Sequence, residues 1–215
     1  MTAYARDVVA LARKDLLVEL RTRETVPAML LFVLSALVVF HFALPASTQG
    51  SDIAVAGLLW MSILFTALLG LTRSFFAERE HGLLEALVLA PCERSAIWLA
   101  KALSVMCFLL VMELIAIPAF ALFYESVSGA TVAAVVLADI GIATVGSLLS
   151  AVAAASRTRE LLLPLLFLPL AIPIIVGGVG ASVADAPGRY LGFLGLYDAI
   201  FAIMSWASFE YVVTE

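Results

Sequence analysis

The chain has 215 residues, of which 64% are hydrophobic and only 13% are charged, and its mean hydropathy is +1.12. A soluble domain carries about 25% charged residues and is about half apolar, so this composition excludes a water-soluble globular protein and predicts an integral membrane protein. The net charge of −5 is less informative, because in a membrane protein the positions of the basic residues matter more than their sum.

The N-terminal segment, residues 1–25, is predicted to form an amphipathic helix at the membrane surface. Val9, Ala12, Leu16 and Leu20 recur at helical spacing along one stripe, and basic residues gather on another side. This pattern is typical of a helix that lies in the interface with its bases near anionic headgroups. The alternative is an ordinary solvated flank that precedes the first membrane span.

Six apolar runs follow, each long enough to cross a bilayer as a helix, which takes about 20 residues. The runs are continuous rather than alternating, so they predict helices and exclude the strands of a barrel. They lie at residues 26–44, 53–72, 97–123, 130–155, 161–181 and 190–213. Only short connections remain, so we expect residues 1–215 to form a single transmembrane domain.

Basic residues predict the orientation. Eleven of the twelve fall on one side of the six-span arrangement, and only Arg189 falls on the other. The positive-inside rule therefore places the N-terminus, the C-terminus and the segment between spans two and three in the cytoplasm.

Two spans carry features of close helix packing. The fourth has a ridge of small residues at every fourth position, Ala143, Ser147, Ala151 and Ala155, which favours close approach of another helix. The fifth carries three prolines, Pro164, Pro169 and Pro173, which remove backbone donors, so the freed carbonyls need partners. The glycine-rich stretch 180–195 is interpreted as either a simple turn or a short re-entrant piece.

No catalytic constellation is visible in the sequence. The H-E-x-x-H, G-x-S-x-G and phosphate-loop patterns are absent. The two histidines, His41 and His81, are predicted on opposite sides of the bilayer, and Cys92 and Cys107 do not have a metal-ligand spacing. We therefore expect no metal site and no enzyme activity in this chain.

Three spans carry one carboxylate near mid-depth, Glu113, Asp139 and Asp198. A charged group there costs about 2.5–3.5 kcal/mol on insertion scales, so these side chains are expected to face the bundle interior. They either line a polar path for a substrate or join helices through a proton or hydrogen bonds. His41, near the outer end of span one, is either an axial haem ligand or an interfacial anchor, and we favour the anchor.

A charged segment, FFAEREHGLLEALVLAPCERSAIWLAK, occupies residues 75–101 between spans two and three. From Leu83 to Pro91 it has the pattern of an amphipathic helix, with leucines on one side and Glu78, His81 and Glu85 on another. We place a cytoplasmic coupling helix at residues 75–94, because such a helix offers a partner protein an apolar stripe and a charged edge. The alternative is a helix that rests on the membrane.

The order of residues in this segment resembles the CcmB family of ABC exporter membrane subunits. The matching positions are Glu78, Arg79, Glu80, Gly82, Leu83, Glu85, Leu87 and Pro91, followed by Lys101 at the start of the next span. The stretches LARKDLLVELRTRETVPAMLLFVLSALVVFHFAL and LTRSFFAEREHGLLEALVLAPCERSAIWLAK, residues 11–44 and 71–101, are also similar to that family. Ala90 departs from it, since serine is frequent before the proline.

The resemblance implies a six-span, non-catalytic subunit of an ABC transporter that acts in c-type cytochrome biogenesis in the bacterial inner membrane. Its implied partners are a CcmA-like ATPase, CcmC, CcmD and CcmE-like proteins, a second copy of the chain and membrane lipid, with no nucleic acid. The ATPase subunit would bind ATP, and its hydrolysis would drive haem export or release of the haem-loaded chaperone.

Direct binding of haem stays open. The tryptophan-rich signature of the CcmC partner is absent, and Trp60, Trp98 and Trp206 are scattered. We therefore expect no cofactor to be bound directly by this chain. The alternative functions are export of another small amphiphile and a scaffold of the maturation complex that transports nothing.

Overall fold

A computed structural model describes residues 3–45, 48, 51–74, 92–124, 127–155 and 159–214. These ranges contain helices and connecting turns but no strand, so the all-α prediction is confirmed for the part of the chain that is described. The helices are α1 (Ala3–Thr22), α2 (Thr25–Ala43), α4 (Asp52–Ser74), α7 (Arg94–Phe123), α8 (Gly129–Ala155), α9 (Arg159–Val183) and α10 (Gly188–Thr214).

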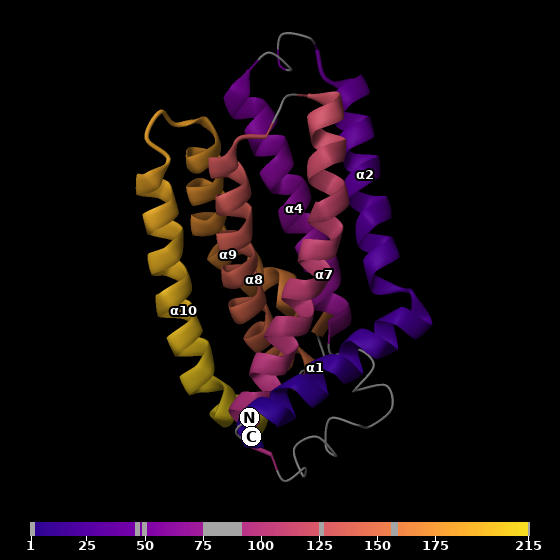
Figure 1. The fold of residues 1–215 in the computed structure, drawn as a ribbon, viewed down its shortest axis with the longest axis vertical. Coiled ribbons are helices and arrows are strands. Elements are labelled where there is room, and N and C mark those ends of the chain that lie inside the picture. Colours follow the sequence, from indigo (N-terminus) through magenta and orange to yellow (C-terminus); the bar gives the residue numbers. More distant parts are fainter. Residues whose placement is uncertain are drawn as a thin grey trace.

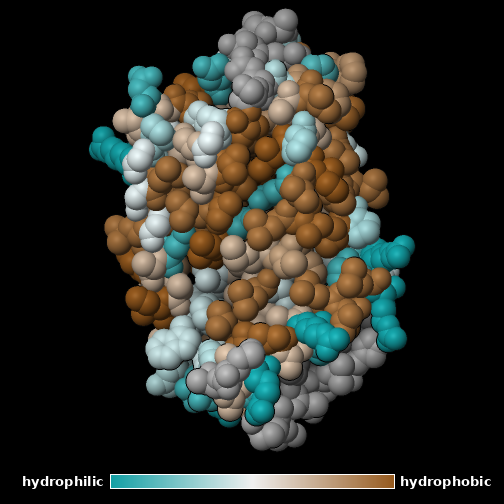
Figure 2. Space-filling model, viewed as in Figure 1, coloured by the Kyte–Doolittle hydropathy of each residue, from teal (hydrophilic) through white to brown (hydrophobic). Residues whose placement is uncertain are grey.

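Six of these helices form a bundle, and α1 lies across one end of it, near both chain termini (Figure 1). The six bundle helices, α2 to α10, are each long and apolar enough to cross a membrane. On the face drawn in Figure 2, apolar residues cover most of the middle, and polar residues gather toward the two ends. The prediction of an integral membrane protein with six spans is therefore confirmed.

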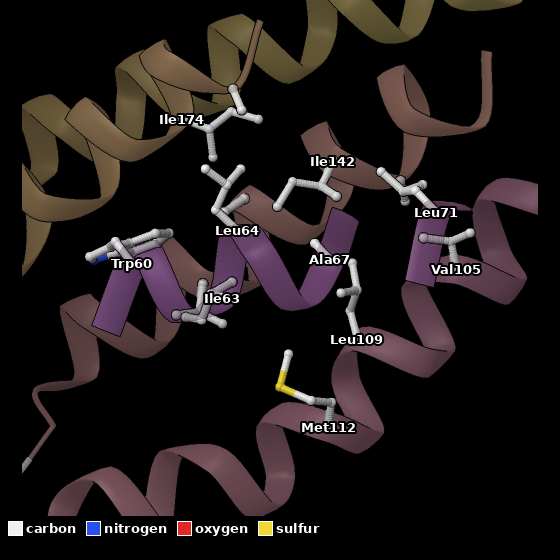
Figure 3. Packing of buried hydrophobic residues seen from close by; sticks show 14 of the residues in the cluster. Trp60, Ile63, Leu64, Ala67, Leu71, Val105, Leu109, Met112, Ile142 and Ile174 are labelled. Carbon is white, nitrogen blue, oxygen red and sulfur yellow. The ribbon is translucent and has the colours of Figure 1, made fainter. Parts of the chain in front are cut away.

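The core is built around α4 and α8, which bury more of their length than the other helices do. In Figure 3, Trp60, Ile63 and Ala67 lie along α4, between α7 and the helices α8 and α9. Trp60 is 1% exposed, and its indole Nε1 donates to Ser182 Oγ on α9 at 3.0 Å. Apolar packing and a few hydrogen bonds between helices therefore hold the bundle together. This is common in a bilayer, where the hydrophobic effect does not drive helices together.

Small residues let α8 approach its neighbours closely. Ala143, Ser147 and Ala151 of the predicted ridge are buried. On another face of α8, a Cβ placed on Gly146 would lie 2.5 Å from Leu71 on α4. A larger residue at this position would push α8 away from α4, so the close contact requires glycine.

The prolines of α9 do not end the helix, which continues through all three to Val183. The Leu170 carbonyl, in the turn before Pro173, accepts a hydrogen bond of 2.8 Å from the Tyr197 hydroxyl on α10. Pro173 lacks the amide that would donate to the carbonyl of residue 169, one residue before Leu170, so partners for the freed carbonyls themselves stay a prediction.

The connection between α9 and α10 is a simple turn of residues 184–187. The Ala184 amide donates to the Gly180 carbonyl at 3.0 Å and so closes the last turn of α9. Helix α10 then starts at once and returns beside α9 (Figure 1). The alternative of a re-entrant piece is therefore wrong, because helical residues occupy both sides of the short turn.

Candidate functional site

The predicted coupling residues lie outside the described residues. These are Glu78, Arg79, Glu80, Gly82, Leu83, Glu85, Leu87 and Pro91, and their assignment stays a prediction. The described chain ends before them at Ser74 of α4 and resumes at Cys92, just before α7. Both flanks lie at the end of the bundle that α1 crosses (Figure 1), so the geometry around α1 shows what the segment is attached to.

Helix α1 is packed directly onto the first turns of α7. Val8 of α1 and Ala96 and Ala100 of α7 form a buried cluster, and Val8 is 4% exposed. Around it lie partly buried apolar residues of both helices, Tyr4, Leu11, Ala12 and Leu99. Of the predicted stripe, Val9 and Leu20 are exposed, whereas Ala12 and Leu16 are partly buried. Helix α1 therefore has one face on the bundle and further apolar residues that point away from it.

A buried ion pair reinforces this contact. Lys101 Nζ on α7 lies 3.0 Å from Asp15 Oδ2 on α1, and the two side chains are only 6% and 10% exposed. Lys14 Nζ lies 3.1 Å from the other oxygen of Asp15. Breaking a buried pair costs far more than breaking a surface pair, because it leaves a desolvated charge without compensation. The pair therefore fixes α1 to α7 in one register.

The same helix is joined to α2 by a side chain. Glu19 Oε1 accepts hydrogen bonds from the Thr25 and Val26 amides at 2.9 and 2.8 Å. These amides belong to the first turn of α2, which has no intrahelical partners for them, and a carboxylate there also suits the helix dipole. Between the helices Arg23 has a φ of 54°, a left-handed conformation that ends α1.

The last turn of α4 contacts the turn between α1 and α2. Arg73 Nη1 donates to the Glu24 carbonyl, in the turn between α1 and α2, at 3.2 Å. Together, these contacts connect α1 to α7, α2 and α4, and we call them the α1 joint. A displacement of either flank of residues 75–91 would therefore act on α1 as well.

A second cluster joins the first turns of α7 to α8 and α10. It contains Ile97, Trp98, Ala151, Ala154 and Phe209, with Leu11 of α1 at its edge. The indole Nε1 of Trp98 donates to the Thr144 carbonyl of α8 at 3.2 Å. A shift at the start of α7 would therefore be passed to two further helices.

Cys92, at the downstream flank, lies close to α1. Burial raises the pKa of its thiol, and the nearby Asp7 carboxylate raises it further. The thiol is therefore less reactive than an exposed one at neutral pH. The electrostatic effect of Asp7 on the thiol also indicates that α1 approaches this flank.

All three predicted membrane-embedded carboxylates are buried, as expected: Glu113 is 3%, Asp139 0% and Asp198 6% exposed. The structure brings Glu113 of α7 and Asp139 of α8 together, so that each carboxyl acts on the other. Asp198, on α10, faces another position of α8, where its Oδ1 would be 2.7 Å from a Cβ placed on Gly141. Of the three acids, Glu113 and Asp139 therefore form a pair, and Asp198 is not part of it.

His41 lies at the opposite end of the bundle from α1, within an aromatic cluster. Its ring centroid is 5.2 Å from Phe123 and 5.6 Å from Tyr124, whose hydroxyl donates to the Leu37 carbonyl at 3.2 Å. This packing fits the anchor that we favoured. Among the described residues no group of three or more His, Cys, Asp or Glu could hold a metal ion, and His81 lies outside them.

From the sequence alone, Asp15 and Glu19 were not identified as functional residues. Tyr4, Val8, Leu11, Asp15 and Glu19 recur three or four residues apart, which is the spacing of one helix face. The signal was available, but a stripe that changes from apolar to acidic does not resemble a membrane-facing stripe. For Lys101, the sequence indicated a place in the family pattern and in the charge asymmetry, but not an ion pair with α1.

Comparisons with known proteins find a family and relatives that match most of the chain. A family model described as "CcmB protein" matches residues 6–209. The chain is 31% identical over 187 residues to "Heme exporter protein B" of Bradyrhizobium diazoefficiens, covering 83% of this chain and 82% of that protein. It is 33% identical over 183 residues to the protein of the same name from Pseudomonas aeruginosa, covering 83% and 81%.

Proposed function

The chain belongs to the CcmB family, and on this basis we propose that it is the membrane subunit of an ABC-type haem exporter in the bacterial inner membrane. It is the non-catalytic part of that complex. A separate CcmA-like ATPase hydrolyses ATP, and this chain converts the hydrolysis into helix movement. The outcome of the movement is export of haem or release of a haem-loaded chaperone.

The observation that carries the proposal is the joint formed by α1. Residues 75–91 are the part of the chain that an ATPase would contact, and they are continuous with α4 and α7. A displacement of residues 75–91 is therefore passed to the first turns of α7, which contain Lys101. Because Asp15 holds Lys101 and Glu19 holds the first turn of α2, α1 moves α2 together with α7. One contact with the ATPase can thus displace several spans.

The charges support a cytoplasmic position for this end of the bundle. Bases at the ends of α1, α4, α7 and α9 gather where α1 crosses, whereas Arg189 starts α10 at the other end. By the positive-inside rule, both termini and residues 75–91 then face the cytoplasm. In that orientation α1 lies at the cytoplasmic membrane surface, where the exposed Val9 and Leu20 can meet lipid.

The remaining partners follow from family membership. We expect two copies of the chain to pair with two ATPase subunits and to work with CcmC, CcmD and CcmE-like proteins. The chain itself needs no bound cofactor for this function. ATP enters through the ATPase, and contact with haem remains to be tested by adding haem to the purified chain and recording its absorption.

The test is charge reversal in the coupling segment. We expect the variant with Glu78→Lys and Glu85→Lys, and separately Pro91→Leu, to insert normally but to lose stimulation of the ATPase and assembly of c-type cytochromes. The matched control is Asp52→Lys with Asp185→Lys, which makes the same charge change with exposed residues at the opposite end of the bundle. The control should keep both activities.

Three outcomes would contradict the proposal. Normal cytochrome c assembly in the coupling variants would exclude a coupling function for residues 75–91. Failure to co-purify with any ATP-binding subunit, or ATP hydrolysis unaffected by the chain, would favour a scaffold. Deletion of the gene without a selective loss of holo-cytochromes c would favour an exporter of another small amphiphile.

A further inference from the structure

Two carboxyl groups meet between α7 and α8 in the middle of the bundle. Glu113 is 3% exposed and Asp139 is 0% exposed, and each acts on the other electrostatically. Their surroundings are apolar, since the residues next to them on the two helices belong to the main hydrophobic core: Leu109, Met112, Ala116, Val135, Ala138 and Ile142. The pair is therefore enclosed by hydrocarbon.

No basic group in the described part of the chain compensates the pair. The base nearest along α7 is Lys101, which is twelve residues and so about 18 Å away along the helix axis, and it pairs with Asp15. The other bases of the packed helices, Arg73 of α4, Arg159 of α9 and Arg189 of α10, lie at helix ends. In the central turns of α2, α4 and α9 there is no charged residue.

The oxygens of the pair are also without other partners. Glu113 Oε1 and both Asp139 oxygens are buried and have no hydrogen-bond partner among the described residues. The other acid that faces α8 is Asp198 of α10, next to Tyr197, and a carboxyl group supplies no positive charge to the pair. Two carboxylates in contact in an apolar site cannot both be ionised, because each charge would be buried and repelled.

We propose that Glu113 and Asp139 share one exchangeable proton, and that the pair is a proton-binding site that joins α7 to α8. The proton converts a repulsive contact into a hydrogen bond between the two helices. If α7 moves away from α8, water reaches the carboxyls and the proton is released. This inference rests on the described residues alone and holds whether or not the proposed transport function is correct.

Proton release on unfolding tests the site directly. The purified chain is unfolded with SDS in weakly buffered detergent solution at pH 7, and released protons are counted with an indicator dye. We expect the Glu113→Gln and Asp139→Asn double variant to release one proton fewer per chain than the wild type. Asp52→Asn, an exposed acid at the start of α4, is the control and should release the same number. Equal release from the wild type and the double variant would overturn the proposal.

Infrared spectroscopy of the folded protein provides a second measurement. The native chain should show a protonated carboxyl band that shifts in D₂O, and this band should weaken in Glu113→Gln. If the double amide variant does not fold, this single variant keeps the comparison valid. A carboxyl band unchanged by Glu113→Gln would contradict the shared proton.

A hydrophobic carbodiimide distinguishes a proton from a metal cation, because it modifies protonated carboxyls in apolar sites. We expect peptide mapping to find the label on Glu113 or Asp139, with a rate that falls as the pH is raised and is unaffected by sodium. Protection by sodium at constant pH would mean that a metal cation occupies the pair, which would overturn the proposal.

Discussion

The ion pair between Asp15 and Lys101 provides a quantitative test of the joint between α1 and α7. The charged atoms are 3.0 Å apart, which gives a gross attraction of about 5.5 kcal/mol at an effective dielectric constant of about 20. Desolvation offsets much of this energy, because both side chains are at least nine-tenths buried. We therefore expect a net coupling energy of about 2 kcal/mol between the two residues.

The two single variants should differ in cost. Asp15→Asn leaves the Lys101 ammonium buried without its carboxylate, and we expect a loss of about 3 kcal/mol in the free energy of unfolding. Lys101→Met should cost less, because Lys14 still lies 3.1 Å from Asp15 and compensates its charge. The double variant should recover part of the stability, since it leaves neither charge unpaired.

The assay is reversible SDS unfolding of the purified chain, followed by circular dichroism, for the wild type, both single variants and the double variant. Arg13→Met, on an exposed position of α1, is the control for loss of a positive charge and should change the free energy of unfolding by less than about 0.5 kcal/mol. A coupling energy below about 0.5 kcal/mol would refute the conclusion that the pair fixes α1 to α7.

Two further predictions test the packing and the flank. Gly178→Ala should lower the free energy of unfolding by about 1–3 kcal/mol, because its Cβ would lie 2.4 Å from the buried ring of Trp60. The control in the same SDS assay is Gly57→Ala, which has nothing within 4 Å of its Cβ and should be neutral or slightly stabilising. In a variant with Cys92 as its only cysteine, maleimide modification should be slow at neutral pH and faster as the pH rises, because burial and Asp7 raise the pKa of the thiol. The further change Asp7→Asn should speed this modification several-fold. An unchanged rate in Asp7→Asn would show that the carboxylate is not near the thiol.

The fold was largely predictable because the membrane imposes it. Hydrocarbon admits continuous apolar helices with satisfied backbone groups, so length and hydropathy alone indicate six of them. Hydropathy is less informative at helix ends. Helix α7 starts at Arg94, before the apolar run at Ile97, because its first turns pack against α1 through the fully buried Ala96.

The candidate site was predictable in kind but not in detail. A carboxylate in the middle of a span must face the interior, so the burial of Glu113, Asp139 and Asp198 follows from the cost of exposing a charge to lipid. Which two of them meet depends on the relative rotation and height of α7 and α8. Side-chain volumes along the whole contact set these quantities, and no single residue pattern encodes them.

Helix α7 connects the two polar features of the molecule. Its N-terminal end is fixed to α1 by Lys101, and its middle is joined to α8 by Glu113. Packed helices move as stiff elements, because a close-packed interior transmits displacement rather than absorbing it. A movement of α7 that begins at residues 75–91 would therefore carry Glu113 relative to Asp139. The same helix can thus transmit the push of a partner and determine whether the buried pair keeps its proton.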